Sequence, residues 1–148
     1  MYERLLPVLP LFERMTFLRS VPLFGELSGE DLRSVAEIVE VVERPAGTVI
    51  FRKGDPGEDL YLIARGQVAV RDGKIELNTL GEREFFGELA VLDREPRSAD
   101  IVCLVDTRLL RLRSADLGEL MARRPQICEP IMLVLVRRLR AITQRVTQ

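Results

Sequence analysis

Two charged side chains stand out in an otherwise apolar stretch, FFGELAVLDREPRSA, at residues 85–99. Glu88 and Arg97 lie nine positions apart, and the segments on both sides have the composition of strands. Charged side chains are rarely buried unless they are paired or bound to something. Glu88 and Arg97 are therefore surface residues, partners of each other, or contacts to a ligand.

The chemistry that these residues offer is the binding of an anion beside a hydroxyl group. Arg97 carries a planar fork of donors that matches two phosphate oxygens, and an ionised Glu88 only accepts hydrogen bonds, which suits a hydroxyl. Gly87 lets a ligand approach the backbone. The segment ELAVL can form one helical turn whose free amides attract an anion. A sugar phosphate fits this set, and a surface ion pair of low energetic value is the open alternative.

Composition excludes several other chemistries. The chain has 148 residues and a net charge of −1, with 47% apolar and 30% charged residues, as is usual for one globular domain. It contains no histidine, so a Ser-His-Asp triad, a Cys-His pair and a histidine metal site are impossible, and we expect neither catalytic residues nor a metal site. Cys103 and Cys128 are expected to be buried thiols in a reducing cytoplasm. No apolar run reaches the roughly 18–20 residues that span a bilayer.

The first half of the chain predicts helices and then strands. Residues 2–19 are expected to be helical, and residues 1–19 are interpreted as a linker from an upstream module. A second helix is expected over residues 27–47, with Ser28 as its N-cap and Pro45 and Gly47 at its end. Its apolar residues fall on one helical face: Leu32, Val35, Ile38, Val39 and Val42.

From residue 48 to residue 113 the pattern changes to that of strands. Short runs such as TVIF, LYLIARG and RLLRLR alternate with turns, which is typical of an antiparallel barrel or jelly roll. The segment VAVRDGKIEL predicts a hairpin with Asp72-Gly73 in a type I′ turn. This register places four apolar residues on one face: Val68, Val70, Ile75 and Leu77.

The last part of the chain is expected to form two helices. Ser114 is the predicted N-cap of the first, which Pro125 ends, and Pro130 is the predicted first residue of the second. The last helix has a basic side and an apolar stripe: Ile131, Leu135, Leu139, Ile142 and Val146. The stripe either forms a homodimer through residues 130–148 or packs on the barrel.

These elements predict a fold that is mainly β, an antiparallel jelly roll with N-terminal helices and two C-terminal helices. The domain is assigned to residues 20–148, with the barrel at about 46–113 and the C-terminal helices at about 114–148.

The stretch FGELAVLDREPRSA resembles the phosphate-binding cassette of cyclic nucleotide-binding domains, the family found in catabolite activators and in protein kinase A regulatory subunits. The matching residues are Phe86, Gly87, Glu88, Leu89, Ala90, Pro96, Arg97, Ser98 and Ala99. The likeness extends over roughly residues 16–146, including PAGTVIFRKGDPGEDLYLIARGQVAV. Residues 93–95, DRE, depart from the family because they lack a glycine that is common there.

The resemblance implies a role for each residue of the site. Arg97 would bind the exocyclic oxygens of the cyclic phosphate, and Glu88 would accept a hydrogen bond from the ribose 2′-hydroxyl. The cassette would supply the remaining contacts to the phosphate, from Phe86, Gly87, Leu89, Ala90, Ser98 and Ala99. The base would lie against a wall formed by Val70, Leu77 and Asn78.

The last helix would cover the base, as it often does in this family. Arg138 is the first candidate because a guanidinium can stack on a purine, and Ile142 and Thr143, one turn further, are the next. The alternative is that Arg138 is simply solvated on a basic helix face.

The function implied is that of a sensor and not of an enzyme. It would bind cyclic AMP or cyclic GMP, without a cofactor, and its last helix would control an attached or partner effector such as a channel or transporter on the cytoplasmic side of a membrane. Two alternatives stay open: an interaction module of the same fold that binds no nucleotide, and a catabolite-activator-like regulator without its DNA-binding domain. Direct DNA binding is not expected, since the sequence stops at Gln148.

Overall fold

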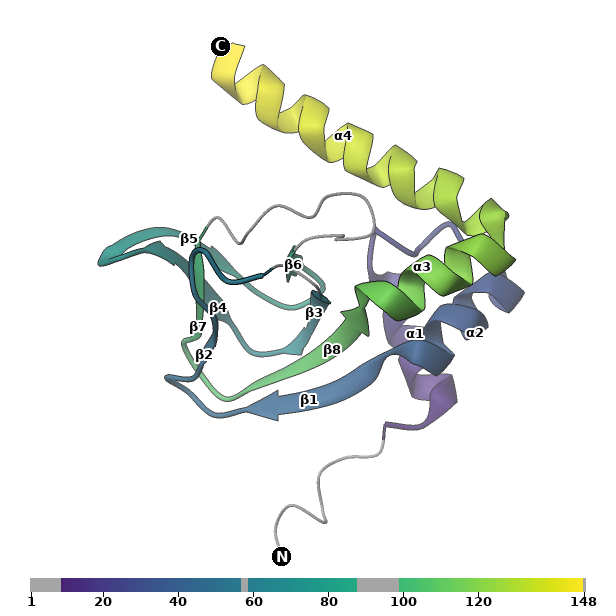
Figure 1. Cartoon of the computed structure of the whole chain (residues 1–148), viewed down its shortest axis with the longest axis horizontal. Coiled ribbons are helices and arrows are strands. Elements are labelled where there is room, and N and C mark those ends of the chain that lie inside the picture. The colour runs from purple at the N-terminus through teal and green to yellow at the C-terminus, as the bar shows by residue number, and fades with distance from the viewer. Residues whose placement is uncertain (1–8, 57–58, 88–98, 148) are drawn as a thin grey trace, which may run out of the picture.

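The computed structural model describes residues 9–56, 59–87 and 99–147, and their strands form two antiparallel sheets that face each other (Figure 1). The first sheet contains, in spatial order, β1 (Glu40–Arg44), β8 (Thr107–Arg113), β3 (Asp59–Arg65) and β6 (Phe85–Gly87). The second contains β2 (Val49–Phe51), β7 (Asp100–Cys103), β4 (Val68–Asp72) and β5 (Ile75–Leu80). This is the predicted jelly roll with flanking helices, and the predicted fold class is confirmed.

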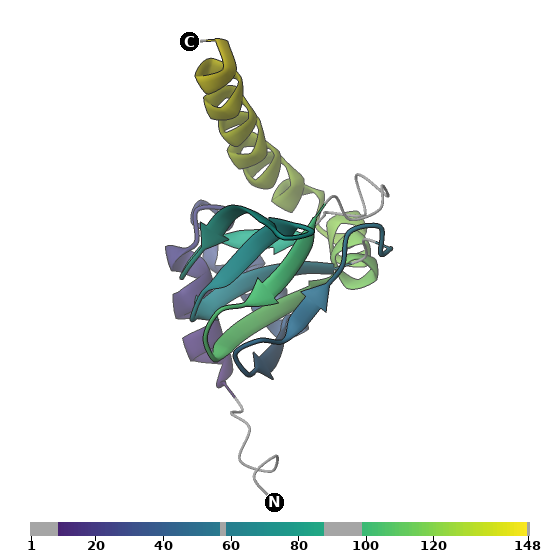
Figure 2. The same ribbon diagram turned by 90° about the vertical axis from the view of Figure 1, so that its left-hand side faces the viewer.

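The helices gather at one end of the barrel (Figure 1). They are α1 (Leu11–Ser20), α2 (Gly29–Ile38), α3 (Ser114–Arg123), the short 3₁₀ helix η2 (Pro125–Ile127) and α4 (Cys128–Thr147). The long helix α4 leaves this end and projects away from the barrel (Figure 2). In the part of the chain that the structure describes, no helix is both long and apolar enough to cross a membrane.

The first sheet is buried on both of its faces, so the domain has two adjoining cores. On one face Leu60, Leu110 and Leu112 pack with the helices. On the other face Ile63 and Leu109 pack inside the barrel with residues of the second sheet. Strands β3 and β8 pair over most of their length. The first sheet therefore separates the core under the helices from the core inside the barrel and contributes side chains to both.

The predicted helix over residues 27–47 is wrong in its second half. Ser28 does cap α2, since its Oγ accepts a hydrogen bond from the Asp31 amide at 3.1 Å, but the helix ends at Ile38. Residues 40–44 form β1 and pair with β8, and Val42 is buried inside the barrel. β-Branched valines favour strands, and a strand here finds a partner in β8. The barrel therefore begins at Glu40 and not near residue 46.

The N-terminal helix also differs from the prediction. Residues 1–8 lie outside the described part, and the described helix begins only at Leu11, after Pro10 in an extended conformation. Leu18 is fully buried in the core shared with α2. Whether residues 1–19 act as a linker stays a prediction.

The predicted β4–β5 hairpin is present, but its register is different. Asp72 pairs with Ile75, so the loop is Gly73-Lys74, and Gly73 takes the positive φ of 64° that such two-residue loops require. A bulge follows, because Val70 pairs with Asn78 while Arg71 pairs with Glu76. Leu77 is the extra residue, and it is 58% exposed, so the predicted apolar face does not form.

The C-terminal helices begin slightly away from the predicted positions. Arg113 is the N-cap of α3, and Ser114 is the first helical residue and not the cap. Helix α4 begins at Cys128, which makes Pro130 its third residue. Proline is tolerated there because the amides of the first turn have no partner within the helix.

Both cysteines are free thiols. Cys103 is buried inside the barrel, and burial raises the pKa of its thiol, so it stays protonated at neutral pH. Cys128 is only half-buried, in contrast to the prediction.

Candidate functional site

The two ends of the cassette segment are fixed by strands of different sheets. Gly87 is the last residue of β6 in the first sheet, and Asp100 is the first residue of β7 in the second. Five predicted contact residues lie between them, outside the described residues: Glu88, Leu89, Ala90, Arg97 and Ser98. Residues 88–98 therefore connect the two sheets of the barrel, and the proposed roles of these five residues stay predictions.

Gly87 opens this connection with a backbone conformation that favours glycine. Its φ is 93°, in the region where a Cβ is strained, and it pairs with Leu60 of β3. The sheet therefore holds Gly87 in place while its lack of a side chain allows the chain to turn.

Phe86 anchors β6 inside the barrel. It is 6% exposed, and its ring stacks on Tyr61, with ring centroids 5.1 Å apart and an interplanar angle of 11°. Phe51 from β2 adds a tilted contact at 5.9 Å. This aromatic cluster joins both sheets directly beneath the start of the cassette, so Phe86 supports the site from within the core.

The other end of the cassette is held as firmly. Ala99 is 8% exposed. The next residue, Asp100, pairs with Arg71 of β4, and its Oδ1 accepts a hydrogen bond from the Lys53 amide at 2.7 Å. The chain thus leaves the cassette at a position fixed by β4 and by the turn at Lys53.

The residues predicted to form the base wall are not equivalent. Val70 is half-buried on β4 and pairs with Asn78 on β5. Asn78 is exposed, and its side-chain oxygen accepts a hydrogen bond from the Thr79 amide at 2.8 Å. Leu77 lies at the bulge and is exposed. Asn78 lines the pocket beside α4, so among the described residues it is the best placed of the three candidates.

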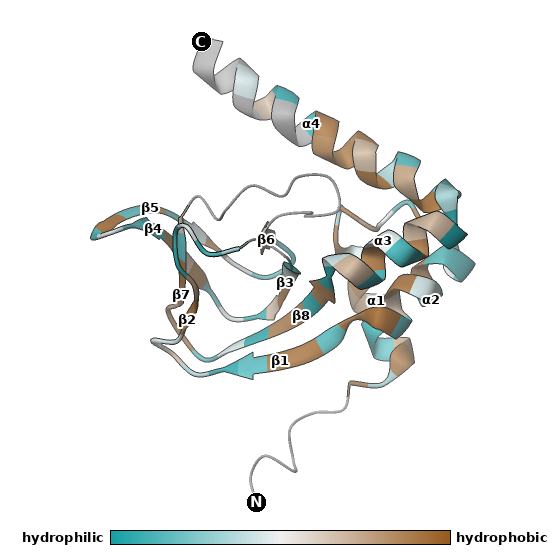
Figure 3. Cartoon of the chain, in the orientation of Figure 1, coloured by the Kyte–Doolittle hydropathy of each residue, from teal (hydrophilic) through white to brown (hydrophobic). Residues whose placement is uncertain are grey.

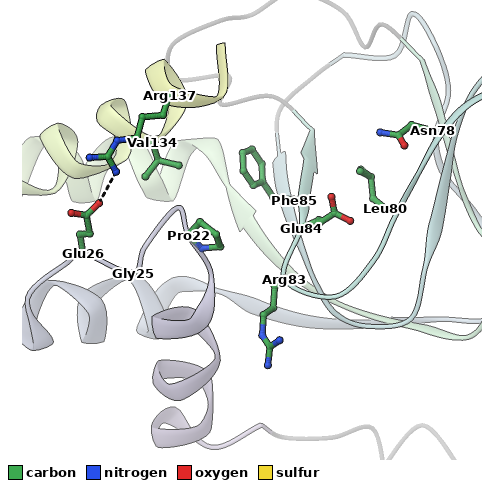
Figure 4. A pocket seen from close by; sticks show the side chains of 10 residues that line it. All are labelled: Pro22, Gly25, Glu26, Asn78, Leu80, Arg83, Glu84, Phe85, Val134 and Arg137. Atoms are coloured by element: carbon green, nitrogen blue, oxygen red, sulfur yellow. Dashed lines mark hydrogen bonds and ion pairs between the residues drawn. The ribbon is translucent and has the colours of Figure 1, made fainter. Parts of the chain in front are cut away.

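That pocket has a volume of about 840 Å³ and lies between the barrel and α4 (Figure 4). The barrel contributes Asn78, Leu80 and Phe85, and the turns beside it contribute Pro22, Gly25, Glu26, Arg83 and Glu84. Helix α4 contributes Val134 and Arg137. The mixture of apolar walls and a few polar groups is typical of sites for small molecules.

Among the α4 side chains that the structure describes, Val134 and Arg137 lie at the pocket, and the lid predicted at Arg138, Ile142 and Thr143 stays a prediction. Of the predicted lid residues, Thr143 is exposed, and the side chains of Arg138 and Ile142 lie outside the described part. Arg137 lies at the pocket and forms an ion pair with Glu26, with Nη1 and Oε2 3.3 Å apart. Val134 and Arg137 are three positions apart and so share a helix face, which is a signal that the sequence already contained.

Chemically, the described pocket lining combines apolar side chains with charged ones, Glu26, Arg83, Glu84 and Arg137. Among the residues that the structure describes, no cluster of three acidic or cysteine residues could hold a metal ion. Leu80, Phe85 and Val134 contribute the apolar part of the lining, and a guanidinium such as that of Arg137 can stack on a planar ring.

A family model described as the cyclic nucleotide-binding domain matches residues 41–124, which include the whole cassette, β1 except for Glu40, and all elements from β2 to α3. The chain belongs to this family. The matched region is more than half of the chain and contains the strands that hold both ends of residues 88–98.

Relatives of the domain occur in proteins of different kinds. A cyclic nucleotide-gated potassium channel of Mesorhizobium japonicum is 37% identical over 111 residues, which are 74% of this chain and 30% of the channel. A cAMP-dependent protein kinase regulatory subunit of Pyricularia oryzae is 34% identical over 120 residues, 78% of this chain and 29% of that subunit. This chain therefore spans about a third of the length of such relatives.

A solved structure supports the same assignment. The catabolite activator protein of Thermus thermophilus aligns with a TM-score of 0.73 at 34% identity, over 85% of this chain and 62% of that protein. The domain is thus a member of a regulatory family whose relatives include a channel, a kinase subunit and a catabolite activator.

Proposed function

We propose that this domain is a sensor for cyclic AMP and that binding changes the position of α4, which controls an attached or associated effector. The observation that carries the proposal is the motif FGELA…PRSA, which begins in β6 and ends just before β7 in a chain of this family. In the proposal, Arg97 pairs with the cyclic phosphate and Glu88 accepts a hydrogen bond from the 2′-hydroxyl, the one ribose hydroxyl that a 3′,5′-cyclic phosphate leaves free.

We propose that the ligand is bound without chemical change. The chain has no histidine to act as a general base. The free energy of binding would instead favour one position of α4 over another, because a ligand shifts an equilibrium by its differential affinity for the two states. We therefore assign the domain a regulatory role and no catalytic one.

Cyclic AMP is proposed before cyclic GMP because the kinase-subunit relative is named for cyclic AMP. Ser98 is compatible with either base. Competition of labelled cyclic AMP by unlabelled cyclic GMP measures the preference directly, and a tighter binding of cyclic GMP would reverse this part of the proposal.

The proposed effector is a channel or transporter on the cytoplasmic side of a membrane, by analogy with the Mesorhizobium relative. Residues 1–19 would then link the domain to it. A catabolite-activator-like regulator without its DNA-binding domain is the alternative suggested by the Thermus relative.

A second candidate function rests on the surface of α4. Met132, Leu133 and Val136 are 53%, 42% and 42% exposed, so three apolar side chains of one helix are open to a partner. The domain would then act as a nucleotide-independent interaction module, for example as a homodimer through residues 130–148. Calorimetry with cyclic AMP separates the two functions, since only the sensor takes up nucleotide.

The proposal is tested by titrating three proteins with cyclic AMP: the wild type, Arg97→Ala and Arg94→Ala. Arg94 is the matched control because it is an arginine of the same cassette that the family motif does not include. We expect Arg97→Ala to weaken binding by about 100-fold or more, since it removes charge-assisted hydrogen bonds of ~1.5–3 kcal/mol each. We expect Arg94→Ala to bind like the wild type. Equal affinities of Arg97→Ala and the wild type would overturn the proposal.

A further inference from the structure

An ion pair at the edge of the pocket joins α4 to a segment far away in the sequence. Glu26 lies in the turns between α1 and α2, and Arg137 lies on α4, 111 positions later. The Arg137 guanidinium points toward the Glu26 carboxylate at one side of the pocket (Figure 4). Any movement of α4 toward the hairpin of β4 and β5 changes this contact.

The start of α4 is fixed by a separate and more buried contact. Asp31 is 6% exposed, and its Oδ1 accepts hydrogen bonds from Arg124 at 2.8 Å and from Gln126 at 3.1 Å, just before α4 begins. Ile131 in the first turns of α4 is fully buried. Arg137 is nine residues beyond Cys128, or about 14 Å along the helix at 1.5 Å per residue. The ion pair therefore restrains α4 well beyond its anchored end.

Apolar residues occur both along α4 and at the end of the β4–β5 hairpin (Figure 3), and several of them are exposed. On α4 the exposed apolar surface is formed by Met132, Leu133 and Val136, and on the hairpin Ile75 and Leu77 are 67% and 58% exposed. Closer approach of the helix and the hairpin would remove part of this surface from water, which is favourable. The Glu26–Arg137 pair ties α4 to the turns between α1 and α2, so it opposes such an approach.

We propose that the Glu26–Arg137 ion pair is an autoinhibitory contact that holds α4 in the open position and lowers the affinity of the nucleotide site. This inference rests on the proposed function, because the ligand whose affinity it sets is the cyclic nucleotide. Closure over the ligand breaks the pair, so part of the binding free energy is used for that step. A mutation that removes the pair removes the free-energy cost of breaking it, so the nucleotide should bind more tightly.

The test uses Glu26→Gln, which keeps the shape of the side chain and removes its charge. Glu37→Gln is the matched control, since Glu37 is exposed on α2 and does not line the pocket. Calorimetric titration with cyclic AMP should give an affinity about two- to fivefold tighter for Glu26→Gln than for the wild type, as expected for an exposed ion pair. The difference should shrink at high salt, which screens the pair. Glu37→Gln should match the wild type.

Equal or weaker binding by Glu26→Gln, in a wild type that binds cyclic AMP, overturns this inference and leaves the proposed function intact. An absence of nucleotide binding in every variant instead contradicts the proposed function. Hydrogen exchange of the α4 amides without nucleotide then decides whether the pair restrains the helix. Faster exchange in Glu26→Gln than in Glu37→Gln supports the restraint, and equal exchange in the two variants contradicts it.

Discussion

Strand β8 and helix α4 are built from similar residues, but they are held very differently. The sequence of β8 is TRLLRLR, and α4 contains the run LVLVRRLR. In β8, Leu109, Leu110 and Leu112 are completely buried. In α4, Leu133 and Val136 are 42% exposed.

The difference comes from the neighbours and not from the composition. β8 pairs with β1 on one side and β3 on the other, and its arginines form ion pairs with glutamates of β1, including Arg108 with Glu43 at 2.6 Å. Helix α4 is attached mainly at its first turns. Stability is not uniform within a protein, and elements with few buried contacts open most easily. The barrel is therefore the frame of the site, and α4 is the element best suited to move.

The largest effect on the frame is expected for Gly66→Ala. Gly66 has a φ of 108°, and a Cβ there would lie 2.6 Å from Thr107 Oγ1 and 2.9 Å from the Asp106 carbonyl oxygen. Strain and overpacking together should lower the free energy of unfolding by about 3 kcal/mol or more, measured by urea denaturation. The control is Gly73→Ala, where a Cβ meets nothing within 4 Å. Equal losses in the two variants would show that β8 is not tightly held at this end.

An intermediate effect is expected where the frame meets α4. Asp31→Asn removes the charge that accepts hydrogen bonds from Arg124 and Gln126. We expect a loss of about 1–2 kcal/mol in the free energy of unfolding, since the contact is charge-assisted and largely buried. Glu30→Gln is the control, because its side chain is 81% exposed and lies 3.7 Å from Arg124. If Asp31→Asn is no less stable than Glu30→Gln, the contact of Asp31 with Arg124 and Gln126 does not anchor the start of α4.

The smallest effect is expected on α4 itself. Met132→Gln replaces a residue that is 53% exposed with one of similar helix propensity, so the free energy of unfolding should change by no more than about 0.5 kcal/mol. At the neighbouring position, Ile131→Ala should cost ~2–4 kcal/mol because Ile131 is fully buried. A large loss in Met132→Gln would mean that α4 packs against a partner, as in the interaction module.

The sequence predicted the jelly roll because strand alternation and turn residues act locally. It missed the end of α2, because the valines at 39, 41 and 42 fit both a helical face and a strand, and only pairing with β8 decides between them. The bulge at Leu77 depends likewise on the partner strand. On α4, neighbouring residues point about 100° apart, so the choice between Arg137 and Arg138 depends on how the helix packs.

The cassette itself was identified by resemblance and not by local physics. Its motif predicts which residues meet the phosphate and the ribose, while the structure describes only its two ends, at Gly87 and Ala99. The contributions of Glu26 and Asp31 were not predicted at all, because each acts on residues about a hundred positions away.

The most direct test of the sensor function is a calorimetric titration of the wild-type domain with cyclic AMP and with 5′-AMP. Thermal unfolding with and without each nucleotide is measured alongside it. The sensor should bind one cyclic AMP per chain and unfold at a higher temperature in its presence. It should bind 5′-AMP at least about tenfold more weakly, because 5′-AMP lacks the cyclic phosphate that the family motif is proposed to bind. No heat and no thermal shift at high micromolar cyclic AMP would contradict the assignment of this domain as a cyclic nucleotide sensor.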